Sequence, residues 1–291
     1  MATGEGKRRA RAIITLLTDF GAEGGYAAAM KGVILGLTRG AMDVEVELVD
    51  LTHEVPRHDV RAGAFLLWSV VPYFPEGTIH LAVVDPGVGT ERRGLIIAAG
   101  GHYLVGPDNG LLIPAAERLG LEAVYQLTEE GYWLPQVSTT FHGRDIFAPV
   151  AAHLARGVPP FKLGRRLEDR SWVDLSFGEG RRSGERLVGE VIYIDPFGNV
   201  ITNIPGELVR DLLQGATLKL RVKARTGAEA RGEGGRTWRL RFLETYARAE
   251  LGELFLLVGS HGLVELAVNQ GSAAEALGLQ PGDRLEFELA R

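Results

Sequence analysis

The stretch Ile13-Ile-Thr-Leu-Leu-Thr18, followed at once by Asp19, sets the pattern for the first half of the chain. It is an apolar run of strand length, and three similar runs rich in β-branched residues follow it. Such runs are typical of strands that are buried on both faces of a parallel sheet. The three further runs are Val44 to Asp50, Ile79 to Asp85 and Leu95 to Ala99.

Segments with helical periodicity lie between and after these runs. One begins near Gly25, and a second runs from Val60 to Val71 with its apolar residues on one face. A third helix is expected after Asn109 and a fourth from about Asp145 to Arg156. Strands that alternate with helices predict an α/β domain with a mostly parallel central sheet over residues 12–156.

The remainder of the chain has a different pattern. Gly, Pro and charged residues replace the periodicity over residues 157–186, which we interpret as a linker. Short strand candidates then recur over residues 187–291, with turn residues such as Pro281-Gly-Asp283 between them. This predicts a smaller, mostly antiparallel β domain. The candidates are Leu187 to Asp195, Thr217 to Val222, Trp238 to Phe242, Leu254 to Val258, Leu263 to Val268 and Leu285 to Leu289.

The composition excludes several classes of protein. The chain has 291 residues, 45% of them hydrophobic and 24% charged, which is the balance of a globular protein with a sizeable core. A net charge of −5, with no Lys/Arg run beyond the tail from Lys7 to Arg11, argues against a nucleic-acid partner. Because the chain has no Cys, disulfides, cysteine–zinc sites and thiol nucleophiles are excluded.

The sequence shows no targeting or membrane segment. Residues 1–11 are polar and basic and lack the apolar stretch of a signal peptide. The longest apolar runs, such as Ala62 to Val71, fall well short of the roughly 20 residues that span a bilayer. We therefore expect a cytoplasmic protein with no membrane partner.

Polar clusters follow the predicted strands of the α/β domain, where open sheets of this class bind their ligands. Asp19-Phe-Gly21 in the first cluster is not a kinase signature, because no Gly-rich loop, strand Lys or His-Arg-Asp loop precedes it. Gly87-Val-Gly89 in the third lacks the rest of a nucleotide-binding fingerprint. Each cluster alone is also compatible with a turn or a helix cap. The clusters are Thr18 to Gly21, Asp50 to His53, Asp85 to Thr90 and Gly106 to Gly110.

Two further segments carry candidate functional residues. His142 stands just before a predicted helix, where a cationic imidazole is disfavoured, so we expect its neutral form. Asp195 to Asn203 places one Asp and two Asn around a glycine turn. His53 and His58 lie near each other, but no pattern with fixed ligand geometry surrounds them, and we expect no metal.

Eight clusters, in this order along the chain, resemble those of the S-adenosylmethionine (SAM) hydrolases, also called SAM hydroxide adenosyltransferases. This family is related to the SAM-dependent fluorinase and chlorinase. The resemblance extends over nearly the whole chain, from about residue 12 to residue 289. The clusters are Thr18-Asp-Phe-Gly21, Asp50-Leu-Thr-His53, Phe74-Pro-Glu-Gly-Thr78, Val84-Asp-Pro-Gly-Val-Gly89, Pro107-Asp-Asn-Gly-Leu111, Thr140-Phe-His-Gly-Arg-Asp145, Asp195-Pro-Phe-Gly-Asn-Val-Ile-Thr-Asn203 and Gly259-Ser-His-Gly262.

The resemblance implies a reaction in which water or hydroxide attacks the ribose C5′ of SAM and gives adenosine and L-methionine. It implies no cofactor, because SAM is itself the substrate. It also implies an N-terminal α/β domain joined to a β-barrel-like C-terminal domain. The subunits would form a homotrimer in which each site lies between the N-terminal domain of one subunit and the C-terminal domain of its neighbour.

The resemblance also assigns residues. Asp85, Arg92 and His142 match the polar group around the nucleophilic water, and either Asp85 or His142 could take its proton. Asp19 matches the carboxylate that holds the ribose hydroxyls. His261 stands where the fluorinase motif has Arg, which leaves its role open. The positions that grip the methionine ammonium and carboxylate are Asp195, Asn199 and Ser260, and the aromatic walls near the nucleoside are Phe141 and Tyr246.

Two other functions fit parts of the same pattern. A SAM-dependent halogenase would place a halide where the water lies, but halide transfer needs no base, and Asp85 with His142 favours the hydrolase. A protein that only binds SAM or adenosine would use the same pocket without turnover. Release of adenosine distinguishes an enzyme from such a binding protein.

Overall fold

A computed structural model of the chain describes residues 10–39, 44–212, 216–223 and 237–289. The chain divides between Ser176 and Phe177 into two compact units, and each is described by itself. Residues 1–9, which carry most of the argument for a cytoplasmic location, lie outside the described residues. No helix in the described ranges is long and apolar enough to cross a membrane.

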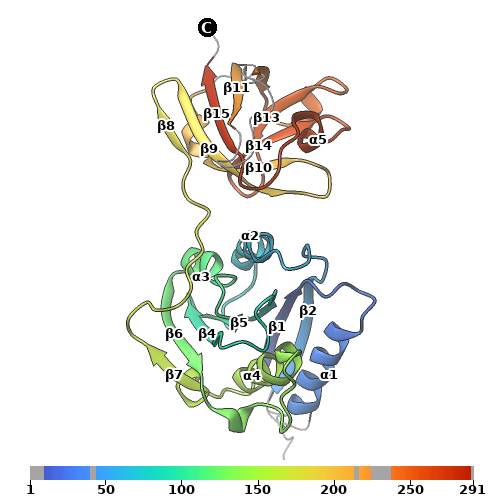
Figure 1. The fold of residues 1–291 in the computed structure, drawn as a ribbon, viewed down its shortest axis with the longest axis vertical. Coiled ribbons are helices and arrows are strands. Elements are labelled where there is room, and N and C mark those ends of the chain that lie inside the picture. Colours follow the sequence, from blue (N-terminus) through green and yellow to red (C-terminus); the bar gives the residue numbers. More distant parts are fainter. Residues whose placement is uncertain (1–9, 40–43, 213–215, 224–236, 290–291) are drawn as a thin grey trace, which may run out of the picture. The chain divides into compact units, whose positions relative to one another are not determined.

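The first unit is built on a seven-stranded sheet (Figure 1). Its strands are β1 (Ala10–Thr18), β2 (Val44–Thr52), β3 (Ile79–Val83), β4 (Gly94–Ala99), β5 (His102–Pro107), β6 (Leu121–Leu127) and β7 (Gly164–Leu167). Their order in the sheet is β2-β1-β3-β5-β4-β6-β7. The first four in this order run parallel, which confirms the expected parallel core. The pairings of β4, β6 and β7 are antiparallel.

The antiparallel direction of β4 is a correction to the sequence prediction, which placed this apolar run among the parallel strands. The reason is the turn at Gly100 and Gly101, whose φ angles are 52° and 78°. Two consecutive residues in this left-handed region form the tight turn that joins antiparallel strands into a hairpin. As a result β5 runs parallel to β3 and ends at the same edge of the sheet. The cluster at Asp108 follows β5 rather than the fourth predicted strand.

Helices cover both faces of this sheet. On one face α1 (Tyr26–Thr38) packs against α4 (Ala148–Ala155), and on the other α2 (Val60–Val70) packs against α3 (Ile113–Leu119). Ile14 and Leu16 of β1 are fully buried in one core cluster with Met30 and Ile34 of α1. The shorter helical turns of the first unit are η1 (Val71–Tyr73), η2 (Glu130–Tyr132), η3 (Gly143–Phe147, a π-helical turn) and η4 (Pro160–Lys162). Those of the second unit are η5 (Gly206–Val209) and η6 (Tyr246–Arg248).

The strand order creates a switch point between β1 and β3. From β1 the chain passes through α1 to β2 on one side, and from β2 it passes through α2 on the opposite face to β3 on the other side. In open α/β sheets the crevice at the carboxyl ends of such strands is where ligands bind. Asp19 directly follows β1, and Asp85 follows β3 by two residues, so both flank this crevice.

The second unit contains a closed seven-stranded barrel, which confirms the expected barrel-like β domain. Its strands are β9 (Arg186–Ile194), β10 (Val200–Pro205), β11 (Thr217–Lys223), β12 (Thr237–Phe242), β13 (Leu254–Val258), β14 (Leu263–Val268) and β15 (Arg284–Leu289). The order β10-β14-β13-β12-β11-β15-β9 closes through the pairing of β9 with β10. Among the strand pairs of this unit that the structure describes, only β12–β13 is parallel. A short strand, β8 (Arg181–Ser183), pairs antiparallel with β9, and the helix α5 (Ala273–Leu277) follows β14.

Residues 157–186 carry little periodicity but contain two short strands. The segment contributes β7 to the first sheet and β8 to the second. In β7 the two central residues, Arg165 and Arg166, are exposed, and β8 has two consecutive arginines. Such short, charged strands form because a neighbouring strand offers backbone partners, and their own sequence gives no apolar alternation.

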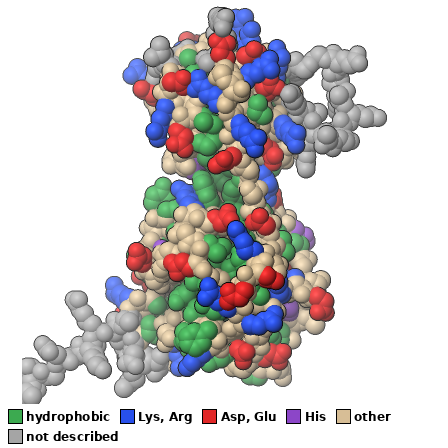
Figure 2. All heavy atoms as spheres, turned by 90° about the vertical axis from the view of Figure 1, so that its left-hand side faces the viewer, with side chains coloured by type: hydrophobic (Ala, Val, Ile, Leu, Met, Phe, Trp, Pro, Cys, Tyr) green, Lys and Arg blue, Asp and Glu red, His purple; other side chains and the backbone are tan. Residues whose placement is uncertain are grey.

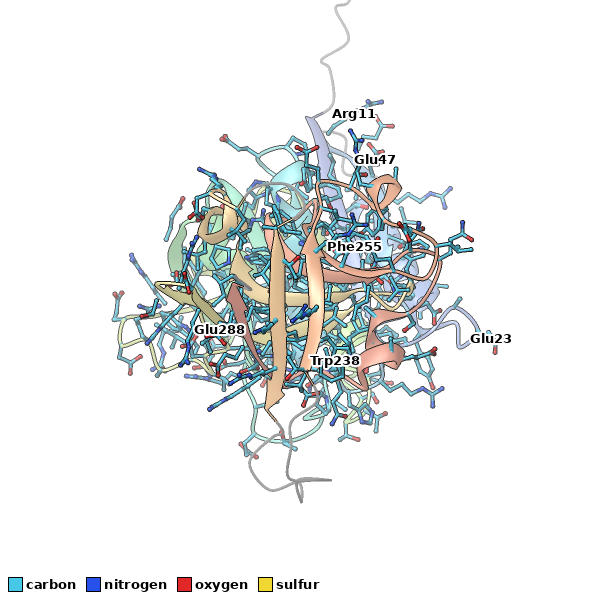
Figure 3. All side chains as sticks on the ribbon, turned by 90° about the horizontal axis from the view of Figure 1, so that it is seen from above. Arg11, Glu23, Glu47, Trp238, Phe255 and Glu288 are labelled. Carbon is cyan, nitrogen blue, oxygen red and sulfur yellow. The ribbon has the colours of Figure 1, made fainter. Side chains whose placement is uncertain are left out.

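The surface carries charges of both signs. In the face shown in Figure 2, Lys and Arg side chains are interspersed with Asp and Glu rather than gathered into a patch of one sign. In the first unit Arg11 and Glu23 point outward into solvent (Figure 3). In the second unit Phe255 is fully buried.

Candidate active site

Three polar side chains form one network beyond the carboxyl end of β3. Arg92 donates from Nε to both carboxylate oxygens of Asp85, at 2.9 and 3.1 Å, and from Nη2 to Oδ2 at 2.5 Å. Nη2 also donates to Nδ1 of His142 at 2.8 Å. The Asp85 and Arg92 side chains are 5% and 11% exposed, so water screens their attraction only weakly.

The network fixes the protonation state of His142. An arginine guanidinium only donates hydrogen bonds, so Nδ1 of His142 accepts, and the proton of the neutral ring lies on Nε2. The pKa of His142 is lowered from 6.5, first by burial and then by Arg92, although Asp85 and Asp145 oppose this. The sequence predicts the neutral form from a helix N-terminus; in the structure, burial and the guanidinium are the main causes.

The loop that carries His142 is held by Asp145, whose side chain is fully buried. Its Oδ2 accepts the backbone N–H of Ser138 at 2.8 Å. The helix expected from Asp145 begins instead as the π-helical turn η3, which leads directly into α4. This turn places the Phe147 ring against the guanidinium of Arg92, with 5.1 Å between the ring centroid and Cζ.

Asp19 lies at the same edge of the sheet. Its Oδ2 accepts the backbone N–H of His58 at 2.9 Å, which orients the carboxylate. The ring of Phe20 packs edge-on against that of Phe141, with centroids 5.7 Å apart. Because Phe20 follows Asp19 and Phe141 precedes His142, this contact joins the segments that carry these two residues.

Tyr26 belongs to this aromatic group, and the sequence analysis missed it. Its ring centroid lies 5.2 Å from that of Phe141 and 5.8 Å from that of Phe20, and the residue is 51% exposed. An aromatic residue directly after Gly25, at the expected start of a helix, is the sequence signal that could have indicated it. The three rings form an apolar wall next to Asp19.

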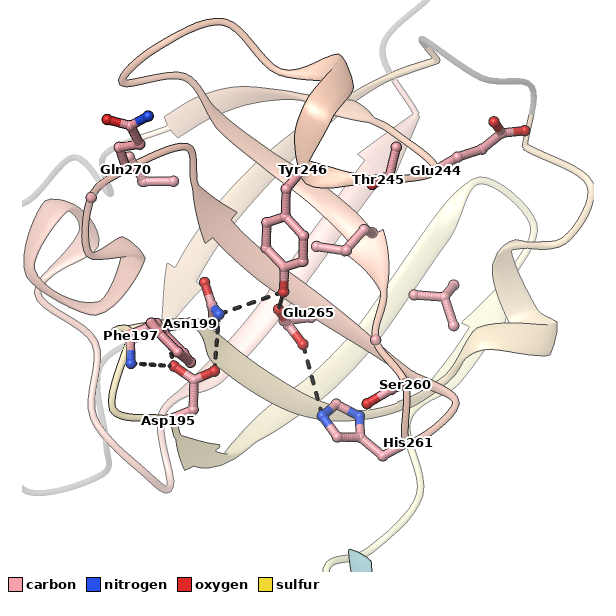
Figure 4. A pocket seen from close by; sticks show the side chains of 15 residues that line it. Asp195, Phe197, Asn199, Glu244, Thr245, Tyr246, Ser260, His261, Glu265 and Gln270 are labelled. Atoms are coloured by element: carbon pink, nitrogen blue, oxygen red, sulfur yellow. Dashed lines mark hydrogen bonds and ion pairs between the residues drawn. The ribbon is translucent and has the colours of Figure 1, made fainter.

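The second unit has a pocket of about 780 Å³ (Figure 4). This is within the usual size range of small-molecule sites. The pocket is lined by residues from the turn between β9 and β10, from the loop that contains η6, and from the β13–β14 hairpin. All four residues of this unit that the sequence analysis assigned to the substrate line it, namely Asp195, Asn199, Tyr246 and Ser260.

Asp195 organises one side of the pocket. Its Oδ1 accepts the backbone N–H groups of Phe197 and Asn199, each at 2.9 Å, and its Oδ2 accepts Nδ2 of Asn199 at 2.9 Å. These bonds fix the carboxylate at the pocket wall, as Figure 4 shows. Phe197 is 79% exposed, so its ring stands at the rim.

Glu265 is the functional candidate that sequence reasoning missed in this pocket. Val264 and Leu266 of β14 point into the barrel core, so Glu265 between them points to the other face of the strand, where it lines the pocket. It accepts a short hydrogen bond from the hydroxyl of Tyr246, and its Oε2 lies 3.8 Å from Nε2 of His261. Burial raises the pKa of Glu265. A single Glu in the apolar strand Leu263–Val268 is the signal that indicates it.

The structure thus places the predicted site residues in two groups. The first unit holds Asp19, Asp85, Arg92, Phe141 and His142, and the second holds Asp195, Asn199, Tyr246 and Ser260. In the ranges that the structure describes, no three His, Asp or Glu side chains gather in a way that could hold a metal ion.

Two family models match the chain, one on each unit. A family model for the SAM hydroxide adenosyltransferase N-terminal domain matches residues 14–164, and a model for the C-terminal domain matches residues 189–286. The chain belongs to the SAM hydroxide adenosyltransferase family.

Individual relatives cover almost the whole chain. The (R)-S-adenosyl-L-methionine hydrolase of Salinispora tropica is 42% identical over 94% of this chain and 96% of that protein. A fluorinase of Nocardia brasiliensis is 29% identical over 99% of this chain and 100% of that protein. The crystal structure of an uncharacterized conserved protein from Thermotoga maritima has a TM-score of 0.83 at 34% identity, covering 94% of this chain and 99% of that one.

Proposed function

We propose that this protein hydrolyses SAM to adenosine and L-methionine by attack of water or hydroxide on the ribose C5′. The observation that carries the proposal is the buried Asp85–Arg92–His142 network at the switch point, in a chain whose relatives include named SAM hydrolases. Because the relative's name specifies the (R) form of SAM, we propose that form, with the R configuration at the sulfonium centre, as the substrate.

The network gives each residue a different part in the reaction. Nδ1 of His142 is occupied by the guanidinium, so the ring offers the nucleophilic water an Nε2–H donor and no free acceptor. Asp85 is therefore the proton acceptor, because its Oδ1 accepts only one bond from Arg92 and keeps a free lone pair, whereas Oδ2 accepts two. Arg92 stabilises the hydroxide that forms when the water gives its proton to Asp85.

A sulfonium substrate suits a site of this kind. Hydroxide and sulfonium lose their charges as the new C–O bond forms, so a pocket poor in water favours the step. The thioether leaves as a neutral group and needs no acid. The protein has to place the nucleophile in line with the C5′–S bond and make hydroxide available near neutral pH.

The remaining groups fit the other parts of SAM. Asp19 would accept hydrogen bonds from the ribose hydroxyls, with the wall formed by Phe20, Tyr26 and Phe141 beside it. The fixed carboxylate of Asp195 would bind the methionine ammonium in the pocket of the second unit.

We further propose that the active form is a homotrimer in which each site uses the first unit of one subunit and the second unit of its neighbour. The division of the assigned residues between the two units supports this. A cyclic trimer requires a heterologous interface, in which two different surfaces of the subunit meet. Light scattering that shows a fully active monomer would contradict it.

Adenosine release from the two SAM epimers tests the function. We expect release from the R epimer, and Asp85→Ala, Arg92→Ala and His142→Ala should each lower turnover at least roughly tenfold while SAM still binds. Full turnover in all three variants would show that the network does not act on the nucleophile. Binding of SAM without release of adenosine would show a binding protein instead of an enzyme.

A further inference from the structure

The segment Pro107–Leu111 contacts both strands that carry the polar network, although none of its side chains has a part in the reaction proposed above. We propose that Asp108 and Asn109 are positioning residues, which fix the backbone next to Asp85 and Arg92 and so hold this pair in place. The inference rests on the proposed function only for the role that it gives to the pair.

Asn109 holds the end of β3. Its Nδ2 donates to the backbone carbonyl of Val84 at 2.8 Å, and its Oδ1 accepts the backbone N–H of Leu111 at 3.1 Å. Both ends of the amide are engaged, so the side chain cannot rotate away from Val84 without losing two hydrogen bonds. Since β3 ends at Val83, this bond anchors the backbone just before Asp85, beyond the last residue of the strand.

Asp108 holds the start of β4. Its backbone N–H donates to the carbonyl of Arg93 at 2.9 Å, and the same carbonyl accepts Nη1 of Arg92 at 3.3 Å. The carboxylate of Asp108 is 2% exposed and accepts Nε of Arg93 at 2.7 Å and the N–H of Val173 at 2.8 Å. One residue therefore fixes the carbonyl that orients the guanidinium of Arg92.

The same ion pair neutralises the cation next to Arg92. Arg93 is the immediate neighbour of Arg92, and its guanidinium also donates to the hydroxyl and the carbonyl of Ser171, at 3.1 and 2.6 Å. Asp108 neutralises Arg93 and leaves Arg92 as the cation that binds Asp85. A buried carboxylate is costly unless it is paired in this way.

The close approach of β5 to β3 makes both contacts short. At Gly106 an added Cβ would lie 2.2 Å from the carbonyl oxygen of Ala82, so a side chain at this position would push the strands apart. The glycine lets Asp108 and Asn109, which follow it after Pro107, reach the backbone of Arg93 and of Val84. The segment thus sets the spacing between the strand ends that carry Asp85 and Arg92.

Four variants test the proposal. Asn109→Ala removes the bond to Val84, Asn109→Asp keeps the shape but cannot donate, and Asp108→Asn leaves Arg93 unneutralised. The control is Thr78→Val, which removes a buried hydrogen bond of 2.7 Å to the carbonyl of Pro75 at the opposite end of β3. The control should lower stability to a similar degree without changing the geometry of the network.

Two readouts separate positioning from a structural role. In the three variants at positions 108 and 109 we expect kcat to fall at least roughly tenfold with KM within about twofold, because substrate contacts are kept. In the ligand-free protein, NMR titration of the His142 ring should show its pKa moving up towards 6.5 as the guanidinium loses its fixed place. Thr78→Val should change neither quantity.

Wild-type kcat and an unchanged His142 titration in the Asn109 and Asp108 variants would overturn the proposal. An equal loss of kcat in Thr78→Val at equal loss of stability would do the same, because it would show a general effect of destabilisation. The titration needs no substrate. If the wild-type protein released no adenosine but the His142 titration still shifted in the variants, the proposed function would fail and the positioning role would stand.

Discussion

Acid should destabilise the first unit through a histidine that lies away from the active site. His80 on β3 is fully buried; its Nδ1 lies 2.9 Å from the hydroxyl of Thr15 and its Nε2 lies 3.3 Å from Nδ1 of His102. Burial, and then the neighbouring His102, lower the pKa of His80 to about 3. The unfolded chain binds a proton near pH 6.5, whereas the folded state does not. The contribution of His80 is therefore fully present above pH 6.5 and is lost as the pH falls towards 3.

The size of the effect follows from the two pKa values. Each pH unit between them removes about 1.4 kcal/mol, so a change from about pH 7.5 to about pH 5 should cost the folded state about 2 kcal/mol. The assay is urea unfolding at both pH values, followed by tryptophan fluorescence, which reports mainly on the first unit because Trp68, Trp133 and Trp172 lie in it. His80→Gln should be less stable near neutral pH but should lose about 2 kcal/mol less on acidification. An equal loss in the variant and the wild type would refute the reasoning.

Three further predictions concern the site. Asp19→Ala should weaken adenosine and SAM binding together, and an unchanged adenosine affinity by calorimetry would remove Asp19 from the site. Because the pKa of His142 is lowered and only the neutral ring accepts the bond from Arg92, kcat/KM should fall on acidification only below about pH 6.5; an acid limb above this value would contradict the assignment. Glu265→Gln should raise KM for SAM at least about threefold with little change in kcat, because the hydroxyl of Tyr246 loses a charged acceptor. An unchanged KM would show that this hydrogen bond does not shape the pocket.

The sequence predicts those strands whose apolar residues are buried regardless of partner. The runs in β1 and β3 are examples, since a strand in the middle of a covered sheet needs apolar residues on both faces. The run in β2 was predicted as a strand for the same reason, but β2 lies at the edge of the sheet and its residues are half-buried or exposed. The Asp and Asn residues around the glycine predict a turn over Asp195 to Asn203, whereas the end of this stretch, with Thr202 and Asn203, belongs to β10. Both are buried, but they are satisfied by the distant carbonyls of Val264 and Phe177, which no local pattern reveals.

Some features of the candidate site could likewise be predicted from the sequence, and others required the structure. The resemblance points to Asp85, Arg92 and His142 by motif, but residues 50 positions apart touch only because the strand order brings their loops to one edge. The tautomer of His142, and with it the choice of Asp85 as the proton acceptor, required the hydrogen-bond geometry. The sequence analysis missed Glu265, because its place in the pocket depends on the alternation along β14 and on its hydrogen bond with Tyr246 in another loop.

The most direct test of the central claim is the origin of the oxygen in the product. The carboxylate of Asp85 alone would repel a halide about 4 Å away by about 4 kcal/mol at an effective dielectric constant near 20. Arg92 offsets part of this repulsion but serves hydroxide equally well, so water should be the nucleophile even in saline buffer. With R-configured SAM in water labelled with heavy oxygen, mass spectrometry should find one labelled atom in the 5′-hydroxyl of adenosine. Adenosine without the label, or 5′-chloro-5′-deoxyadenosine in the presence of chloride, would contradict the account.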